Sequence, residues 1–408
     1  MIILDRPYVS DLLAETLQRL RTPVLRNAVS EKVSEEYDLE LLDGKEFAAR
    51  ANAEKYPLIY TSSEDAIGWI AENLGPSGLP HRIDRLKNKI NFRSMIEEDH
   101  PEFFYAGIDV EALRHLDPSS LPKPFVVKPA VGFFSMAVRK VESDADWPAA
   151  LKSIEEDLES FGGMYPGQVF DPGRFIIEEG IKGEEYAVDV YYDETGRPVI
   201  LNVLHHLFSS GTDVSDTTYV TSKAIVESGI RMFTGPLARI GQQADLKNFP
   251  LHIEMRVDGC DIVPIEANPM RFAGFGGTDF GWYAWGINTH EYFLEKKKPD
   301  WETIFEGKED RVYSMYVAFI PEDLPVSKVE DIDYEGFAAN FDKVLELRRT
   351  DWRNYRVFSF VFTETGPGTA TEIERNLQLD LSQYLLLSLI HISEPTRPPS
   401  TSRMPSSA

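Results

Sequence analysis

The first 85 residues alternate short apolar runs with segments whose apolar positions recur every three or four residues. Residues 1–4 are apolar, and after Ser10, which can cap a helix, leucines stand at positions 12, 13, 17 and 20. The same order returns in residues 56–61 and 66–74. Short apolar runs are typical of buried strands and the wider spacing of amphipathic helices, so an alternating α/β domain with a mostly parallel sheet is predicted here.

Further along, the apolar positions alternate with a period of two, which is typical of strands. Strands are predicted at 125–128, 175–178, 186–191, 198–203, 251–257 and 261–267. Turn residues at 193–196 and at Asp258-Gly259 predict two hairpins, so this sheet is expected to be antiparallel. A basic helix is predicted at about 84–98, and after residue 299 the chain returns to a mixed α/β pattern whose clearest strand is 357–362.

The length, the apolar content and the net charge of the chain exclude several classes of protein. The 408 residues leave room for two or three domains, and 42% apolar residues without a membrane-length run are typical of a globular protein. The excess of 67 acidic over 42 basic residues, a net charge of −25, disfavours nucleic acid and anionic membranes as partners. With a single cysteine, Cys260, and no leader-like start, we expect a cytoplasmic protein.

The last residues form a separate case. The text LSLIHISEPTR from Leu387 resembles the translation of a sequencing adapter, and SRMPSSA at 402–408 fits the other end of the same oligonucleotide. We therefore interpret residues 387–408 as an assembly artefact that carries no fold, with a natural disordered tail as the alternative.

The second predicted hairpin gathers charged and amide side chains. If the apolar residues of both strands face the core, then the side chains between them share the opposite face. These are Glu254, Arg256, Glu266 and Asn268. Magnesium prefers oxygen ligands and commonly takes one or two carboxylates together with substrate phosphates, so this face suits a magnesium nucleotide. The alternative is an ordinary solvated sheet face.

Three other pieces precede this hairpin in a fixed order. They are a lysine-rich helix, a strand that ends in Lys128 before a loop with glycine and serine, and a strand that leads into Glu178-Glu-Gly-Ile-Lys-Gly-Glu-Glu185. Together with Glu254 and Glu266-Ala-Asn268-Pro269, this order resembles the ATP-grasp superfamily over residues 1 to about 386, and in particular its carboxylate–amine ligases. The resemblance implies an N-terminal domain at 1–85, an ATP-grasp domain at 86–300 with a small lobe at about 120–184, and a mixed C-terminal α/β region at 301–386.

The resemblance also implies which residues bind the nucleotide. Lys128 is expected at the α- and β-phosphates and Lys89 at the phosphate end, with Lys87 as a competitor for the second role. A lysine that ends a buried strand commonly meets an anion. The loop 130–137 that follows Lys128 has one glycine where the family commonly has several, so its backbone amides are expected to approach phosphate less closely. The alternative is that its aromatic residues form a hydrophobic lid that excludes water.

The acidic segment after the third strand is expected at the other end of the nucleotide. The resemblance assigns Glu178 to the adenine, Ile181 to the face of the base and Glu185 to the ribose hydroxyls. Carboxylates suit the neutral and hydroxylated parts of an otherwise anionic ligand.

The resemblance also assigns Glu254, Glu266 and Asn268 to Mg²⁺, or to Mn²⁺ in its place. Arg256 or Arg271 is expected to hold the acyl phosphate or the substrate carboxylate by a bidentate contact. Arg271 stands one residue further from the Asn-Pro pair than the family arginine commonly does. Residues 205–216 are a candidate acceptor loop, and the alternative is that its histidines are structural.

We therefore expect a ligase that uses ATP to activate a carboxylate as an acyl phosphate, which an amine then attacks, with ADP released. Its partners would be a small carboxylate and a small amine, and a homodimer is compatible with the resemblance. Two alternatives stay open, namely a kinase or phosphotransferase on the same fold and a regulatory protein that binds ATP without turnover.

Overall fold

The computed structural model describes residues 1–132, 137–161, 171–209, 217–321, 324–366 and 370–388. Its N-terminal unit is an alternating α/β domain, as predicted. The parallel sheet has the order β3-β2-β1-β4, and the helices α1 to α4 follow its strands in turn. The bounds are β1 (Ile2–Ile3), α1 (Asp11–Leu20), β2 (Val24–Leu25), α2 (Ala28–Val33), β3 (Leu41–Leu42), α3 (Gly44–Asn52), β4 (Tyr60–Thr61) and α4 (Ala66–Asn73).

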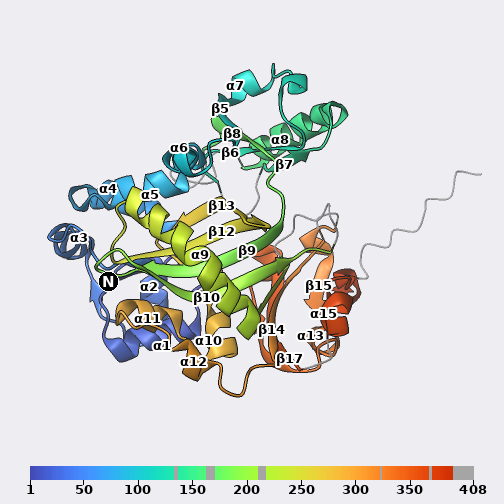
Figure 1. Cartoon of the computed structure of the whole chain (residues 1–408). Helices are drawn as coiled ribbons and strands as arrows, with labels where there is room; N and C mark the ends of the chain where they lie inside the picture. The colour runs from blue at the N-terminus through green and yellow to red at the C-terminus, as the bar shows by residue number, and fades with distance from the viewer. Residues whose placement is uncertain (133–136, 162–170, 210–216, 322–323, 367–369, 389–408) are drawn as a thin grey trace, which may run out of the picture.

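Two helices, α5 (Leu79–Lys87) and α6 (Lys89–Met95), lead into a small lobe that stands apart at the top of Figure 1. Its antiparallel sheet has the order β5-β8-β6-β7 and is packed against α8 (Trp147–Phe161), with the short α7 (Val110–Leu113) beside it. The strands are β5 (Tyr105–Asp109), β6 (Phe125–Pro129), β7 (Arg139–Val141) and β8 (Arg174–Glu179). The sheet therefore already begins at residue 105, upstream of the expected start of the small lobe.

The alternation of side chains along β6 and β8 decides which of them point away from the core of the small lobe. Phe125 and Val127 on β6 and Phe175 and Ile177 on β8 fill the core beneath α8. The residues at the alternate positions of these strands, which include Lys128 and Glu178, must point to the other face of the sheet.

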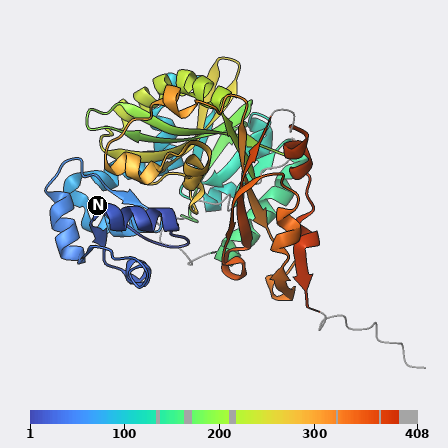
Figure 2. The same cartoon turned by 90° about the horizontal axis from the view of Figure 1, so that it is seen from below.

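The large lobe is built on an eight-stranded antiparallel sheet with the order β13-β12-β9-β10-β11-β14-β17-β16. Its strands are β9 (Glu184–Tyr192), β10 (Pro198–Leu207), β11 (Thr218–Ser222), β12 (Phe249–Asp258), β13 (Asp261–Pro269), β14 (Val312–Phe319), β16 (Val344–Arg349) and β17 (Val357–Thr365). The last three come from the region expected to be a separate C-terminal part, and they extend the same sheet. Figure 2 shows these orange strands on one side of the view and the blue N-terminal unit on the other.

Shorter elements complete the described chain. The loop after β13 leads into α10 (Phe280–Trp285), α11 (Thr289–Leu294) and α12 (Trp301–Ile304), and the C-terminal part adds α13 (Tyr334–Ala338), α14 (Trp352–Tyr355), α15 (Ala370–Asn376) and the two-stranded sheet of β15 (Val329–Ile332) with β18 (Leu385–Leu387). Residues 389–408, most of the suspected artefact, lie outside the described residues. None of the helices described is both long and apolar enough to span a bilayer.

One face of the large sheet is covered by the long helix α9 (Lys223–Gln243), which crosses the strands in Figure 1. Val188, Val203 and Ile253 pack with Phe233 and Leu237 of the helix in one buried cluster. The polar residues at the alternate positions of these strands therefore point to the other face of the sheet. That face lies toward the small lobe and the N-terminal unit.

The close approach of α9 to the sheet depends on Gly229, and we predict that Gly229→Ala destabilises the protein. A Cβ atom there would lie 2.6 Å from a methyl carbon of Val203. Such overpacking costs about 1–3 kcal/mol, more than the roughly 1 kcal/mol that alanine gains in helix propensity. Urea unfolding measures the change, and Ser228→Ala on the same turn serves as the control, with a change within about 0.5 kcal/mol. An unchanged or higher stability of Gly229→Ala would contradict this packing.

Candidate active site

The β12–β13 hairpin places two carboxylates side by side on the polar face of the large sheet. Glu254 pairs directly with Glu266, and His252 pairs with Asn268, so all four residues lie on one face. The alternation predicts this for Glu254, Glu266 and Asn268, but His252 was not among the predicted residues. The register shifts by one residue after Glu254, and both glutamate side chains keep 23% of their surface exposed. The roles assigned to these residues stay predictions.

Two lysines reach this face from other elements. Lys89, at the start of α6, has its Nζ 3.0 Å from Oε2 of Glu266. Lys128, from the small lobe, has its Nζ 3.5 Å from the carbonyl oxygen of Ile265 on β13 and 2.7 Å from Oε2 of Glu178. The structure thus brings the two predicted phosphate lysines together at the predicted metal ligands.

These pairings shift the pKa values of the groups involved. Burial by itself would raise the pKa of Glu266, but Lys89, Lys87 and Lys128 outweigh it and hold that pKa well below its usual range. Burial would likewise lower the pKa of Lys89, but Glu266 outweighs it and raises that pKa. The carboxylate and the ammonium group therefore stabilise each other in their charged forms.

Glu178 is enclosed by cations and is only 2% exposed. Arg93 of α6 donates its Nε to one carboxylate oxygen, and Lys128 holds the other. Burial raises the pKa of Glu178, but Arg93 and Lys128 outweigh that effect and bring it to about 2. In this structure the carboxylate orients Lys128, and its expected contact with adenine remains a prediction.

Glu185, expected at the ribose, forms a second ion pair with Arg256, which was expected at the acyl phosphate or the substrate carboxylate. Arg256 Nη2 lies 2.9 Å from Oε2 of Glu185, and its Nη1 donates to the carbonyl oxygen of Ile181 at 3.0 Å. The other oxygen of Glu185 lies 2.9 Å from Nδ1 of His206, whose ring stacks on Tyr219. His206 belongs to the predicted acceptor loop, of which residues 210–216 lie outside the described residues, as do residues 133–136 of the phosphate loop.

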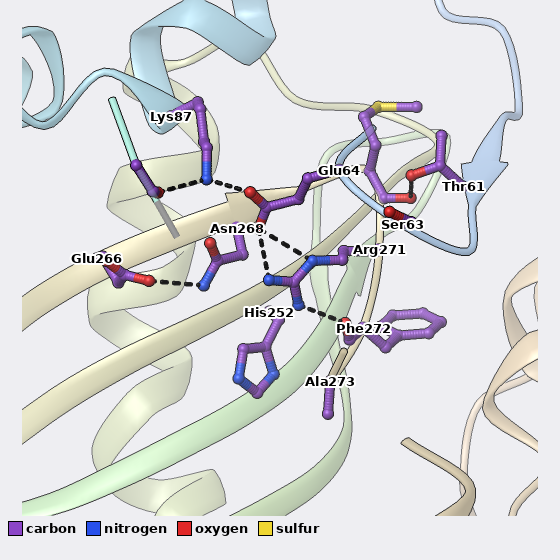
Figure 3. A network of polar contacts seen from close by, with 12 residues as sticks. Thr61, Ser63, Glu64, Lys87, His252, Glu266, Asn268, Arg271, Phe272 and Ala273 are labelled. Atoms are coloured by element: carbon purple, nitrogen blue, oxygen red, sulfur yellow. Dashed lines mark hydrogen bonds and ion pairs between the residues drawn. The ribbon is translucent and has the colours of Figure 1, made fainter. Parts of the chain in front are cut away.

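Arg271 is aimed by an unusual backbone conformation. Met270, the extra residue between the Asn-Pro pair and Arg271, has a positive φ of 71°, and its carbonyl oxygen accepts the amide of Thr61 at 2.8 Å. A left-handed conformation is uncommon for methionine, so the contact with the N-terminal unit fixes this turn. It directs Arg271 to Glu64, which lies between Arg271 and Lys87 in Figure 3.

Glu64 was not predicted from the sequence. It follows β4 by three residues, at the carboxyl end of the parallel sheet, which is where α/β proteins commonly place ligand-binding side chains. That rule could have singled it out, but its partners lie 23 and 207 residues away in the chain. Arg93 was missed for the same reason.

The donor set fits a hard divalent cation only together with further ligands. The face offers the carboxylates of Glu254 and Glu266 and the amide of Asn268, whose nitrogen donates to Glu266 at 3.1 Å. Within the described ranges, no three His, Cys, Asp or Glu side chains gather closely enough to hold a metal ion by themselves. A magnesium ion here would complete its shell with phosphate oxygens and water, as is usual for this metal.

Comparisons with known proteins agree on one family. Residues 121–279 match the model of the ATP-grasp domain family, and the match ends in the loop after β13. A 213-residue stretch is 28% identical to the ATP-grasp enzyme fsqD of Aspergillus fumigatus. That alignment covers 50% of this chain but 35% of the relative, so the chain spans about a third of the length of that protein.

Solved structures match nearly the whole chain. The L-amino acid ligase from Bacillus licheniformis superposes with a TM-score of 0.63 at 18% identity, over 95% of this chain and 98% of that one. The N5-carboxyaminoimidazole ribonucleotide synthetase from Thermotoga maritima gives 0.59 at 14% identity, over 94% and 98%. The carboxyaminoimidazole ribonucleotide synthase from Aspergillus clavatus, solved with ATP, gives 0.60 at 13% identity over the same shares. At these identities the likeness shows the fold.

The pairing of Glu178 predicts a specific dependence of stability on pH. A carboxylate whose pKa is lowered from 4.5 to about 2 on folding stabilises the protein above about pH 4.5, and the contribution disappears as the pH falls toward 2. Glu178→Gln leaves Arg93 and Lys128 without their counter-ion, so we expect a loss of about 3–5 kcal/mol at pH 7.

The measurement is urea unfolding of the wild type and the variant between pH 3 and pH 7. The difference in the free energy of unfolding should shrink steadily below about pH 4.5. The neighbouring substitution Glu179→Gln should cost less than about 0.5 kcal/mol across that range. A difference that stays constant with pH would show that Glu178 is not ion-paired in the folded protein.

Proposed function

We propose that this chain, whose residues 121–279 match the ATP-grasp domain family, is an ATP-dependent ligase that joins a carboxylate to an amine and releases ADP and phosphate. The observation that carries this proposal is the meeting of Lys89 and Lys128 with the paired carboxylates of Glu254 and Glu266. Such an arrangement suits the magnesium complex of a triphosphate, because the lysines can bind the phosphates and the carboxylates can bind the metal ion.

The proposed reaction has two steps. A carboxylate oxygen of the first substrate attacks the γ-phosphorus of ATP, the bond to the bridging oxygen breaks, and ADP leaves an acyl phosphate behind. The amine nitrogen of the second substrate then attacks the acyl carbon, phosphate departs, and the amine gives up its proton to water or to the phosphate. Glu254, Glu266 and Asn268 would hold Mg²⁺, which neutralises the charge on the transferred group.

The lysines must change partners when the nucleotide binds. Lys89 contacts Glu266 and Lys128 contacts Glu178 in this structure. If Glu266 held Mg²⁺, the ammonium group of Lys89 would be available to a phosphate oxygen. The buried charges then remain neutralised throughout, which is the condition for holding them away from water.

Of the two candidate arginines, Arg271 is the better placed to hold the acyl phosphate. The guanidinium of Arg256 already binds Glu185 and the carbonyl oxygen of Ile181. The Arg271 side chain is 13% exposed and contacts Glu64. Glu64, Glu266 and Glu254 together raise its pKa against the effect of burial. We therefore assign Arg271 to the acyl phosphate and Arg256 to the orientation of Glu185.

The substrates can be found by screening ADP release with pairs of amino acids and small carboxylates. The structural likeness to an L-amino acid ligase favours amino acids as the first compounds to test. Mass spectrometry of the product then separates the outcomes. An amide supports the ligase, a stable phosphoester would indicate a kinase instead, and ATP binding with no product from any pair would favour a regulatory protein.

Glu266→Ala tests the metal assignment. The variant loses one of two carboxylate ligands, so we expect magnesium-dependent ADP release to fall at least about 100-fold, the scale of a lost electrostatic catalytic group. The assay is coupled ADP release at saturating Mg²⁺, with circular dichroism as the check on folding. Asp261→Asn, at the exposed tip of the same hairpin, is the control and should retain full activity. Unchanged turnover of Glu266→Ala would remove the metal assignment.

Lys128→Ala tests the phosphate assignment. Loss of a charge-assisted contact with the phosphates should weaken binding of the magnesium complex of a non-hydrolysable ATP analogue about tenfold or more. Calorimetry gives the dissociation constant directly. Lys140→Ala on β7 of the same lobe is exposed and should bind the analogue like the wild type. Equal affinity of Lys128→Ala and the wild type would contradict the phosphate role.

A further inference from the structure

A buried carboxylate from the N-terminal unit, that of Glu64, takes part in the site without a role in the proposed reaction. Its Oε1 accepts hydrogen bonds from Nε of Arg271 at 3.1 Å and from Nη2 at 2.5 Å, and its Oε2 accepts one from Lys87. Lys87 also donates to the carbonyl oxygen of Gly132 at 2.9 Å. The Glu64, Lys87 and Arg271 side chains are 7%, 4% and 13% exposed, so the cluster is largely buried. Figure 3 shows its contacts.

The geometry shows which part of Arg271 is occupied. The Nε–Nη2 edge, which typically binds carboxylate or phosphate, contacts Glu64, and Nη1 donates to the carbonyl oxygen of Phe272 at 2.9 Å. Glu64 therefore stands where an anionic group of a ligand could bind the same edge. Lys87 and Arg271 outweigh the effect of burial and hold the pKa of Glu64 below its usual range, so the carboxylate is charged at neutral pH.

The charged groups that act on Glu64 come from several parts of the chain. The cations are Lys87 of α5 and Arg271 after β13, with Lys89 of α6 next to Lys87. The other nearby carboxylates are those of Glu266 and Asp65. Glu64 is the carboxylate among them that contacts both Lys87 and Arg271, and it enters the site from the N-terminal unit.

We propose that Glu64 is a positioning residue that acts as an internal counter-anion, holding Arg271 and Lys87 at the metal face until a phosphate group takes over part of their charge. This rests on the proposed function, in which Arg271 binds the acyl phosphate. The carboxylate would limit how tightly phosphate is held, and so favour its release after each turnover. It would also link the N-terminal unit to the phosphate loop through Lys87 and Gly132.

The sign of the effect follows from electrostatics. Glu64→Gln keeps the shape of the side chain but removes a negative charge a few ångströms from the place of the phosphate. Two unit charges about 6 Å apart at an effective dielectric constant of about 20 interact strongly enough to change an affinity tenfold or more. Removing the competing charge should therefore tighten phosphate binding, although it loosens the hold on Arg271.

The experiment titrates inorganic phosphate into the protein saturated with MgADP and measures the dissociation constant by calorimetry. Glu64→Gln should bind phosphate about tenfold more tightly than the wild type. Glu64→Asp, which keeps the charge, should restore an affinity near that of the wild type. The matched control is Asp65→Asn, which removes the adjacent carboxylate, itself 4.0 Å from Arg6, and should change the affinity by less than about twofold.

A purely structural Glu64 would give a different pattern. Its replacement would lower the melting temperature but leave the phosphate affinity of the folded protein unchanged, and an unchanged or weaker affinity of Glu64→Gln would overturn the proposal. If Glu64→Gln does not fold, Lys87→Met provides the second test. It removes one cation and leaves Glu64 paired with Arg271, so phosphate should bind more weakly, and an unchanged affinity would again overturn the proposal.

The titration needs neither substrate of the ligase reaction. If the Glu64→Gln variant binds phosphate more tightly but the protein forms no amide with any substrate pair, this inference stands and the ligase proposal fails. If the protein forms an amide but its Glu64→Gln variant binds phosphate with wild-type affinity, the ligase proposal stands and this inference fails.

Discussion

Neutralisation of buried charge at the meeting point of three structural units is the constraint on which this site depends. Lys89, Lys128 and Arg271 each contact a carboxylate across a boundary between secondary-structure elements. A buried ion without a partner is strongly destabilising, so the units cannot separate without exposing these groups or leaving them unpaired. The same pairs prepare the site for a ligand that brings both kinds of charge, a metal ion and phosphates.

The fold delivers these groups through strand alternation. In the small lobe, the side chains of β6 and β8 divide between a core beneath α8 and a face that carries Lys128 and Glu178. In the large lobe, the strands beneath α9 bury one face and direct Glu254 and Glu266 to the other. The two sheets thus turn their polar faces toward the same space, and the N-terminal unit closes it with Glu64.

The sequence allowed the local part of this arrangement to be predicted, but not the long-range part. Period-two alternation was sufficient to place Glu254 and Glu266 on one face, because apolar alternation in each strand sets which side chains face the core. The turn alone does not set their pairing, since the register shifts by one residue after Glu254 and this shift brings Glu266 opposite it. Glu64 and Arg93 were missed because their partners are set by tertiary packing over long sequence distances. For the same reason the strands of residues 301–386 were not predicted to extend the large sheet, since strand order in a sheet depends on non-local pairing.

The central claim is that a magnesium nucleotide binds between the lysines and the paired carboxylates. A crystal structure of the protein with Mg²⁺ and a non-hydrolysable ATP analogue tests it most directly. We expect a metal ion bound by Glu254 and Glu266, with the triphosphate contacting Lys89 and Lys128 in place of their present carboxylate partners. A nucleotide bound elsewhere, with the pairs of Lys89 with Glu266 and of Lys128 with Glu178 intact, would contradict it.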